Sequence, residues 1–187
     1  MSPLKVFLVD DHKLVRDGIR AMLLGNLSFK VVGTAGTADE FFSKLEETQP
    51  DICVLDVQLP GKSGIEISEI LKDKHPQIKI LIITAMKDDA PVKACRSLGV
   101  EGMISKYSGK ETYLEALEAL KAGRTFYAGQ FTELLLKATQ GKSDKLALLS
   151  DREIDFVKAF TKGLSHKEIA DHLHISPRTV EAHKKNV

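Results

Sequence analysis

The chain has 187 residues and a mass of 20.6 kDa, which is room for one medium-sized domain and a small one. Hydrophobic residues make up 43% of it and charged residues 28%, with 27 Lys or Arg against 26 Asp or Glu, and this balance excludes disorder over the whole length. No apolar run reaches the length of a membrane-spanning helix, and the N-terminal residues lack the pattern of a signal peptide. We therefore expect a soluble, cytoplasmic protein without a membrane partner.

Short runs rich in Val, Ile and Leu alternate with helical patterns up to residue 122. The continuous apolar character of these runs is typical of parallel strands buried on both faces. Strands are predicted at Lys5–Asp10, Phe29–Thr34, Asp51–Val57, Ile78–Ala85 and Gly102–Lys106. Helices are predicted at His12–Leu24, Thr37–Glu47, Gly64–Lys74, Asp89–Leu98 and Lys110–Ala122. The alternation predicts an α/β fold over residues 1–122, a doubly wound five-stranded parallel sheet.

Two of the predicted helices begin with a sequence that fits a capping box. In this motif the side chain of a Ser or Thr accepts the backbone N–H of a Glu three residues later, and the side chain of that Glu accepts the backbone N–H of the Ser or Thr. The pattern occurs at Thr37–Glu40 and at Ser108–Glu111. We expect reciprocal side-chain capping at both places.

The pattern changes after residue 122. Residues 123–145 are interpreted as a linker that contains one helix, Gln130–Thr139, followed by a polar break. Residues 146–187 predict three short helices, each with its own cap, joined by tight turns. This arrangement favours a small all-α helix-turn-helix domain over a catalytic one.

Polar side chains stand where the predicted strands end. Asp10 and Asp11 end the first strand, Asp56 the third, Thr84 the fourth and Lys106 the fifth, so all should lie at one edge of the sheet. Three close carboxylates repel one another unless a cation neutralises them, and Mg²⁺ with oxygen ligands would do so. Lys106 and Thr84 would then bind the oxygens of a phosphoryl group for which Asp56 is the nucleophile. The alternative is that these Asp residues merely cap the following helices. That interpretation would be preferred for Asp11 alone, but not for the whole set.

These residues carry a resemblance to a known family. Val9-Asp10-Asp11-His12, Leu55-Asp56 with Pro60-Gly61 and Gly64, Ile83-Thr84-Ala85 and Ser105-Lys106 resemble the receiver domain of bacterial two-component response regulators, over residues 1–122. The resemblance implies phosphorylation of Asp56 by a sensor histidine kinase. It also implies that Asp11, Asp56 and the backbone carbonyl of Gln58 bind Mg²⁺, assisted by Asp10, and that Thr84 and Lys106 contact the phosphoryl group.

One position departs from this resemblance. Three residues before the lysine, members of the family usually carry Tyr or Phe, which changes rotamer together with the threonine. This chain has Met103 there, which can fill the same space but changes shape less. The neighbouring Tyr107 should point to the other face of the strand, so the switching role is not transferred to it. His12 is interpreted as a helix-entry residue and not as a metal ligand.

The C-terminal region is only weakly basic. From Leu146 onward there are seven Lys or Arg and six Asp or Glu. On the last predicted helix, Arg178, Glu181, Ala182 and Lys185 share one face. Such a face suits readout of a DNA major groove, and it equally suits an ordinary solvated amphipathic helix.

A second resemblance favours the DNA-binding interpretation. Leu149–Glu153, Gly163–Ala170, Leu173–Ser176 and Thr179–His183 resemble the LuxR-type helix-turn-helix, and with the receiver they give the architecture of NarL/FixJ-type response regulators. The resemblance implies a recognition helix at Pro177–Asn186, with Lys167 and Thr179 near phosphates and Glu181, Ala182 and Lys185 facing bases. The fourth helix of that family has no counterpart before Val187, so we expect weak, salt-sensitive binding to double-stranded DNA.

The sequence thus predicts a phosphorylation-gated transcription regulator, in which phosphorylation either promotes a homodimer or frees the small domain. A first alternative is a protein-interaction module with an inert tail. A second is an enzyme on a similar sheet. An aspartyl phosphatase should carry Asp where Gln58 stands, and a flavin protein should carry a Gly-rich phosphate loop in place of Asp10–Lys13. We expect no enzymatic activity beyond Mg²⁺-dependent self-phosphorylation and autodephosphorylation at Asp56.

Overall fold

The computed structural model describes residues 2–85, 89–129 and 131–132. The chain divides into two units, Met1–Leu136 and Lys137–Val187, and all described residues belong to the first. Most of the predicted helix Gln130–Thr139 and the three C-terminal helices lie outside the described residues. So do the predicted DNA-binding residues, Lys167, Arg178, Thr179, Glu181, Ala182 and Lys185.

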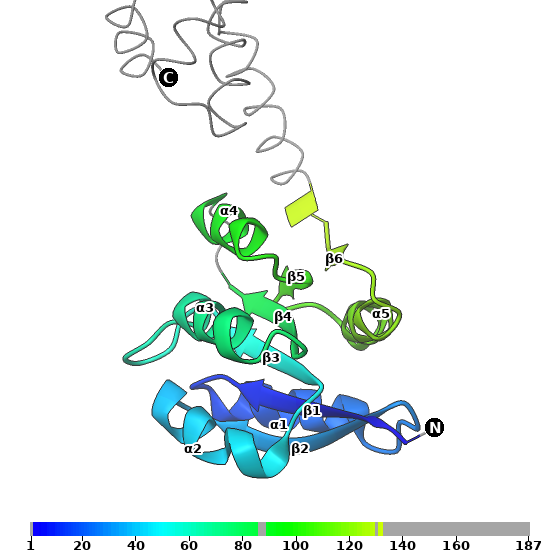
Figure 1. The fold of residues 1–187 in the computed structure, drawn as a ribbon. Coiled ribbons are helices and arrows are strands. Elements are labelled where there is room, and N and C mark those ends of the chain that lie inside the picture. Colours follow the sequence, from blue (N-terminus) through cyan, green and yellow to red (C-terminus); the bar gives the residue numbers. More distant parts are fainter. Residues whose placement is uncertain (1, 86–88, 130, 133–187) are drawn as a thin grey trace, which may run out of the picture. The chain divides into compact units, whose positions relative to one another are not determined.

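A parallel sheet forms the centre of the described unit (Figure 1). Its strands are β1 (Leu4–Val9), β2 (Phe29–Ala35), β3 (Ile52–Asp56), β4 (Lys79–Thr84), β5 (Gly102–Ser105) and β6 (Phe126–Tyr127). They follow the order β2-β1-β3-β4-β5-β6, and each neighbouring pair is parallel. The five predicted strands are confirmed, but the sheet has six strands and not five.

The sixth strand lies in the stretch that the sequence interpretation assigns to the linker. It has two residues, Phe126 and Tyr127, and is too short to produce a recognisable alternation of apolar and polar positions. It pairs with β5, so that Gly102 lies opposite Phe126 and Met103 opposite Tyr127. The sheet therefore continues past the predicted boundary at residue 122.

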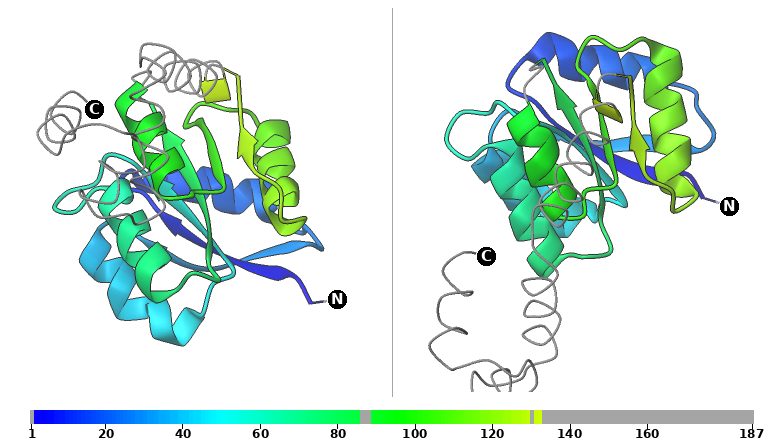
Figure 2. Two further views of the ribbon diagram at one scale, coloured as in Figure 1. Left: turned by 45° about the horizontal axis from the view of Figure 1, so that its top comes forward. Right: turned by 90° about the horizontal axis from the view of Figure 1, so that it is seen from above.

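Helices cover both faces of the sheet (Figure 2). They are α1 (Lys13–Leu23), α2 (Ala38–Thr48), α3 (Gly64–Lys74), α4 (Asp89–Ser97) and α5 (Lys110–Lys121). One apolar cluster joins the sheet to α2, α3 and α4, and a second joins it to α1 and α5. This confirms the doubly wound fold. Among the described residues, no helix combines the length and the apolar character needed to cross a bilayer.

The two predicted capping boxes differ from the observed helix starts. Thr37 accepts the Glu40 N–H at 3.2 Å, but the Glu40 carboxylate turns to the N–H of Gly36 at 2.7 Å, so this box is only half formed. The box at Ser108 is wrong: the N-cap of α5 is Gly109, and no side chain caps it. The N–H of Ser108 is taken up in a turn before the helix begins.

Candidate functional site

The carboxyl ends of the inner strands meet at one edge of the sheet, as predicted. Asp10 follows β1, Asp56 ends β3, Thr84 ends β4 and Lys106 follows β5. Asp10, Asp56 and Thr84 are only 1–2% exposed, although carboxylates and hydroxyls favour water. Three polar residues buried together at a sheet edge indicate a functional site more than a structural one.

Lys106 neutralises both buried carboxylates. Its Nζ lies 2.7 Å from Asp56 Oδ2 and 3.0 Å from Asp10 Oδ2, and its side chain is 8% exposed. Burial by itself would lower the pKa of Lys106, but the hydrogen bonds and charges of the two carboxylates raise it above its usual value. The ammonium group therefore stays charged at neutral pH.

Asp56 experiences opposing influences. Burial raises its pKa above the usual value, and the charge of Asp10 adds to this, while Lys106 and the backbone N–H of Gln58 partly offset the rise. Lys106 thus favours the ionised form of Asp56. The ionised carboxylate is the nucleophilic form.

Two exposed residues extend the acidic site towards solvent. Asp11 and His12 begin the loop before α1, and His12 Nδ1 lies 2.5 Å from Asp11 Oδ1 and 3.3 Å from Lys106 Nζ. His12 is the N-cap residue of α1, which confirms its role at the helix entry. Its imidazole also lies against the carboxylates of Asp10 and Asp11. The sequence interpretation missed this contact, because it arises from the backbone turn at the N-cap.

The carboxylates fit a divalent cation. One ligand atom from each of Asp10, Asp11, His12 and Asp56 can be chosen so that all lie within 4.8 Å of one another. Asp10 Oδ2 is buried, and within the described part of the chain its compensation is the contact with Lys106 Nζ at 3.0 Å. Carboxylate oxygens are the hard ligands that Mg²⁺ prefers.

Arg16 holds the loop that carries Asp10. Its guanidinium donates a hydrogen bond to the Asp10 carbonyl oxygen, while the Asp10 N–H binds the Ala35 carbonyl at 3.1 Å. The Asp10 carboxylate in turn accepts the N–H of His12 at 2.7 Å. The sequence interpretation missed Arg16, whose only signal in the sequence is a basic residue one helical turn after the N-cap residue His12.

The start of α3 packs directly on the backbone of Asp56. A Cβ atom on Gly64 would lie 2.1 Å from the Asp56 carbonyl oxygen, so only glycine fits there. A capping box fixes this end of α3: the Ser63 hydroxyl accepts the Glu66 N–H at 3.3 Å, and the Glu66 carboxylate accepts the Ser63 N–H at 2.9 Å. The start of α3 and the end of β3 are therefore rigidly joined.

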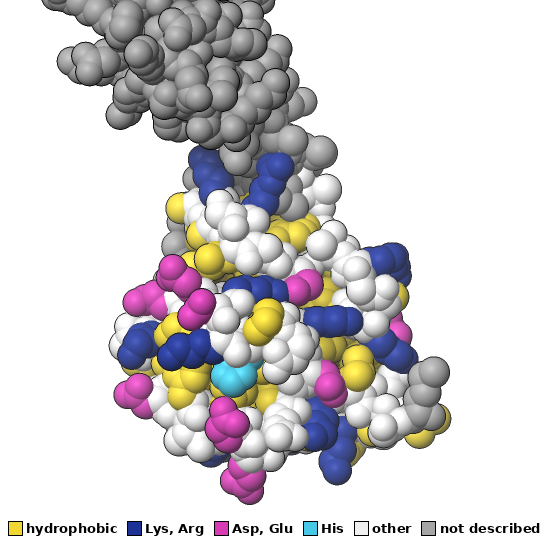
Figure 3. Space-filling view, in the orientation of Figure 1, with side chains coloured by type: hydrophobic (Ala, Val, Ile, Leu, Met, Phe, Trp, Pro, Cys, Tyr) yellow, Lys and Arg dark blue, Asp and Glu magenta, His cyan; other side chains and the backbone are white. Residues whose placement is uncertain are grey.

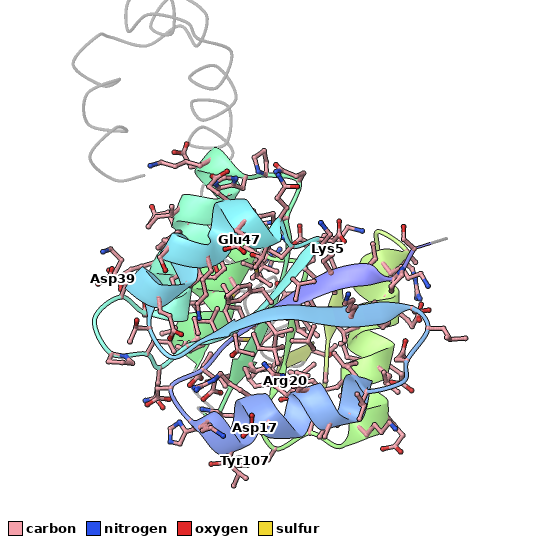
Figure 4. The ribbon with its side chains drawn as sticks, turned by 90° about the horizontal axis from the view of Figure 1, so that it is seen from below. Lys5, Asp17, Arg20, Asp39, Glu47 and Tyr107 are labelled. Atoms are coloured by element: carbon pink, nitrogen blue, oxygen red, sulfur yellow. The ribbon has the colours of Figure 1, made fainter. Side chains whose placement is uncertain are left out.

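The remaining predicted positions of the receiver are placed as follows. Gln58 follows β3, and its N–H binds Asp56. Met103 is fully buried between Ile82 of β4 and Tyr127 of β6. Tyr107 is 82% exposed and points away from the sheet (Figure 4), which confirms that it does not replace Met103 in the core.

The face of the unit seen in Figure 3 carries Lys or Arg side chains interspersed with Asp or Glu side chains. Binding of nucleic acid needs a basic patch or stripe. This face offers none.

Comparison with known proteins identifies the class to which this site belongs. Residues 6–118 match the response regulator receiver domain, and residues 147–187 match the luxR family of bacterial regulatory proteins. The chain belongs to the bacterial response regulators that join a receiver to a LuxR-type DNA-binding domain.

The relatives are similar along almost their whole length. The chain is 32% identical over 193 residues to the oxygen regulatory protein NreC of Staphylococcus aureus, covering 98% of this chain and 89% of the relative. It is 28% identical to the RcsB response regulator of Salmonella typhimurium, with a TM-score of 0.69 and coverage of 100% and 90%. A structure of two RcsB dimers bound to two parallel DNAs is 26% identical, with a TM-score of 0.67 and the same coverage.

Proposed function

We propose that a sensor histidine kinase phosphorylates Asp56 and that this controls binding of the C-terminal domain to promoter DNA. The observation that carries the proposal is the buried pair of Asp56 and Lys106, 2.7 Å apart, beside Asp10. Burying a carboxylate and an ammonium group is costly. A site that must accept and neutralise a phosphoryl group accounts for this cost.

The chemistry follows from the positions of these side chains. A carboxylate oxygen of Asp56 attacks phosphorus, and the new O–P bond gives an acyl phosphate. The P–N bond of the kinase phosphohistidine breaks, its electron pair stays on the imidazole nitrogen, and that nitrogen takes up a proton from solvent. Lys106 moves with the developing negative charge, and the hydroxyl of Thr84 binds a phosphoryl oxygen. Mg²⁺, held by Asp10, Asp11, Asp56 and the carbonyl of Gln58, would supply charge neutralisation at the phosphoryl oxygens.

The second half of the proposal concerns the output. The match of residues 147–187 to the luxR family and the likeness to RcsB dimers bound to DNA support binding of promoter DNA by a homodimer, which we propose takes place in the cytoplasm. Lys167 and Thr179 are proposed to contact phosphates. A recognition surface is proposed for Arg178, Glu181, Ala182 and Lys185. We place the receiver body at residues 1 to 131, since β6 belongs to its sheet, and the DNA-binding domain at 146–187.

A selection experiment tests both halves together. The full chain is incubated with Mg²⁺ and acetyl phosphate, and bound duplexes are recovered from a random-sequence library. The proposal predicts enrichment of one motif by the treated protein and markedly less by Asp56→Asn. Equal enrichment by both proteins would contradict control by Asp56. Phosphorylation without any enrichment would instead favour an interaction module.

A further inference from the structure

The chain that leaves α5 closes the outer edge of β5. The N–H of Phe126 binds the Glu101 carbonyl at 2.8 Å, and the N–H of Ala128 binds the Met103 carbonyl at 3.0 Å. A Cβ atom on Gly102 would lie 3.1 Å from the carbonyl oxygen of Phe126, so this glycine allows the close approach. The edge of β5 that would otherwise have unpaired backbone groups is thereby covered.

Two aromatic side chains anchor this segment on the far side of the sheet from α5. The hydroxyl of Tyr127 donates to the Val100 carbonyl at 2.8 Å. Phe131 is 1% exposed and belongs to the apolar cluster that contains Met103 of β5 and Cys95 of α4. We call residues 126–129 together with Phe131 the clasp. Burial of one large aromatic ring and a hydrogen bond to a buried carbonyl make the clasp a defined structural element.

The clasp and the acceptor site are joined by one short strand. β5 has four residues, and its inner side pairs Met103 with Ile82 and Ser105 with Thr84. The N–H of Lys106 then binds the Thr84 carbonyl at 2.9 Å. A movement of Lys106 or Thr84 that reaches the backbone is therefore passed to the strand whose other side carries the clasp.

A phosphoryl group on Asp56 demands such a movement. Lys106 Nζ lies between Asp56 Oδ2 and Asp10 Oδ2, at 2.7 and 3.0 Å. The added phosphoryl oxygens need the same space and attract the same ammonium group. The Nζ of Lys106 must therefore move away from Asp10.

We propose that this movement of Lys106 displaces the end of β5 and that the clasp thereby transmits the state of Asp56 to the chain beyond residue 131. It is closed while Lys106 bridges Asp56 and Asp10, and it loosens when a phosphoryl group takes Lys106. This rests on the function proposed above and names how the same site is read out. Because coupling between binding equilibria is reciprocal, weakening the clasp must tighten the binding of a phosphoryl mimic at Asp56.

Amide hydrogen exchange tests the forward direction. The full chain is followed by NMR with Mg²⁺, with and without beryllium trifluoride as the phosphoryl mimic. The proposal predicts about tenfold faster exchange of the Phe126 and Ala128 amides on saturation, and no change in Asp56→Asn. Saturation of the resonances around Asp56 with unchanged exchange would overturn the clasp alone. No response around Asp56 at any concentration would overturn the proposed function, and the clasp with it.

The reverse direction uses a single-atom change. Tyr127→Phe removes only the hydroxyl that binds the Val100 carbonyl. The beryllium trifluoride concentration for half-saturation of the resonances around Asp56, measured by NMR with Mg²⁺, should fall about threefold. Tyr107→Phe makes the same change at an exposed position and should leave this concentration unaltered. An unchanged value for Tyr127→Phe, or an equal fall for both variants, would contradict the coupling.

Discussion

Replacing Lys106 with methionine should destabilise the receiver in a way that depends on pH. The substitution keeps the volume of the side chain but removes the ammonium group that lies within 3.0 Å of both Asp10 and Asp56. Two buried carboxylates then face each other without a cation. Breaking a buried ion pair by removing one partner typically costs about 3–5 kcal/mol.

The pH dependence follows from the directions of the pKa changes. The raised pKa of Lys106 means that its contribution to stability is present at pH 7.5 and is lost only as the pH rises through that raised value. In Lys106→Met, the pKa of Asp56, which burial already raises, rises further, so the deficit is largest above that pKa and shrinks as the pH falls towards the unfolded value. Mg²⁺ at about 100 times its Kd should restore about 2.7 kcal/mol by binding the same oxygens.

Thermal unfolding followed by tyrosine fluorescence measures this effect. The chain has no Trp, and its three Tyr all lie in the receiver. A loss of about 3 kcal/mol should lower the midpoint by roughly 6–12 °C at pH 7.5. Lys13→Met, which breaks only an exposed pair with Asp17, should shift it by no more than about 2 °C. A midpoint for Lys106→Met that stays normal, or a deficit that is the same at pH 5 and pH 7.5, would refute the reasoning.

Three further results are expected. Gly64→Ala should abolish phosphorylation and destabilise the receiver by about 2 kcal/mol or more, because the new Cβ would meet the carbonyl oxygen of Asp56. Gly18→Ala, inside α1 with open space around it, should instead stabilise the receiver by about 0.5–1 kcal/mol; urea unfolding measures both effects. Ser63→Ala should lower the stability by about 1 kcal/mol in the same assay, because it removes the N-cap of α3. Ser108→Ala should lower it clearly less, because the Ser108 side chain does not cap α5. Equal losses of stability would contradict the observed caps. Lys167→Ala should lower the salt dependence of DNA binding by about one charge contact in fluorescence anisotropy, and an unchanged slope would remove Lys167 from the interface.

The sequence predicted the receiver fold and most of its site because both depend on patterns along the chain. Continuous apolar strands mark a buried parallel sheet, and parallel strands bring their carboxyl ends to one edge. Asp10, Asp56, Thr84 and Lys106 meet there as predicted.

The features that the sequence did not predict depend on contacts between distant segments. Two residues of β6 carry no periodic signal, and their pairing becomes visible only against β5. The role of Arg16 requires knowing that its guanidinium reaches back to the Asp10 carbonyl. Ser108 matches the sequence of a cap, but a turn before α5 leaves the N-cap position to Gly109. Such choices are made by tertiary geometry, which local propensity does not encode.

The central claim is that Asp56 is the phosphoryl acceptor of this site. Intact-mass spectrometry of the full chain and of Asp56→Asn, incubated with acetyl phosphate with and without Mg²⁺, tests it most directly. The account predicts one phosphoryl adduct on the native chain, formed only when both Mg²⁺ and Asp56 are present. An adduct that persists in Asp56→Asn, or a folded native chain that stays unmodified with Mg²⁺ and with its histidine kinase, would contradict it.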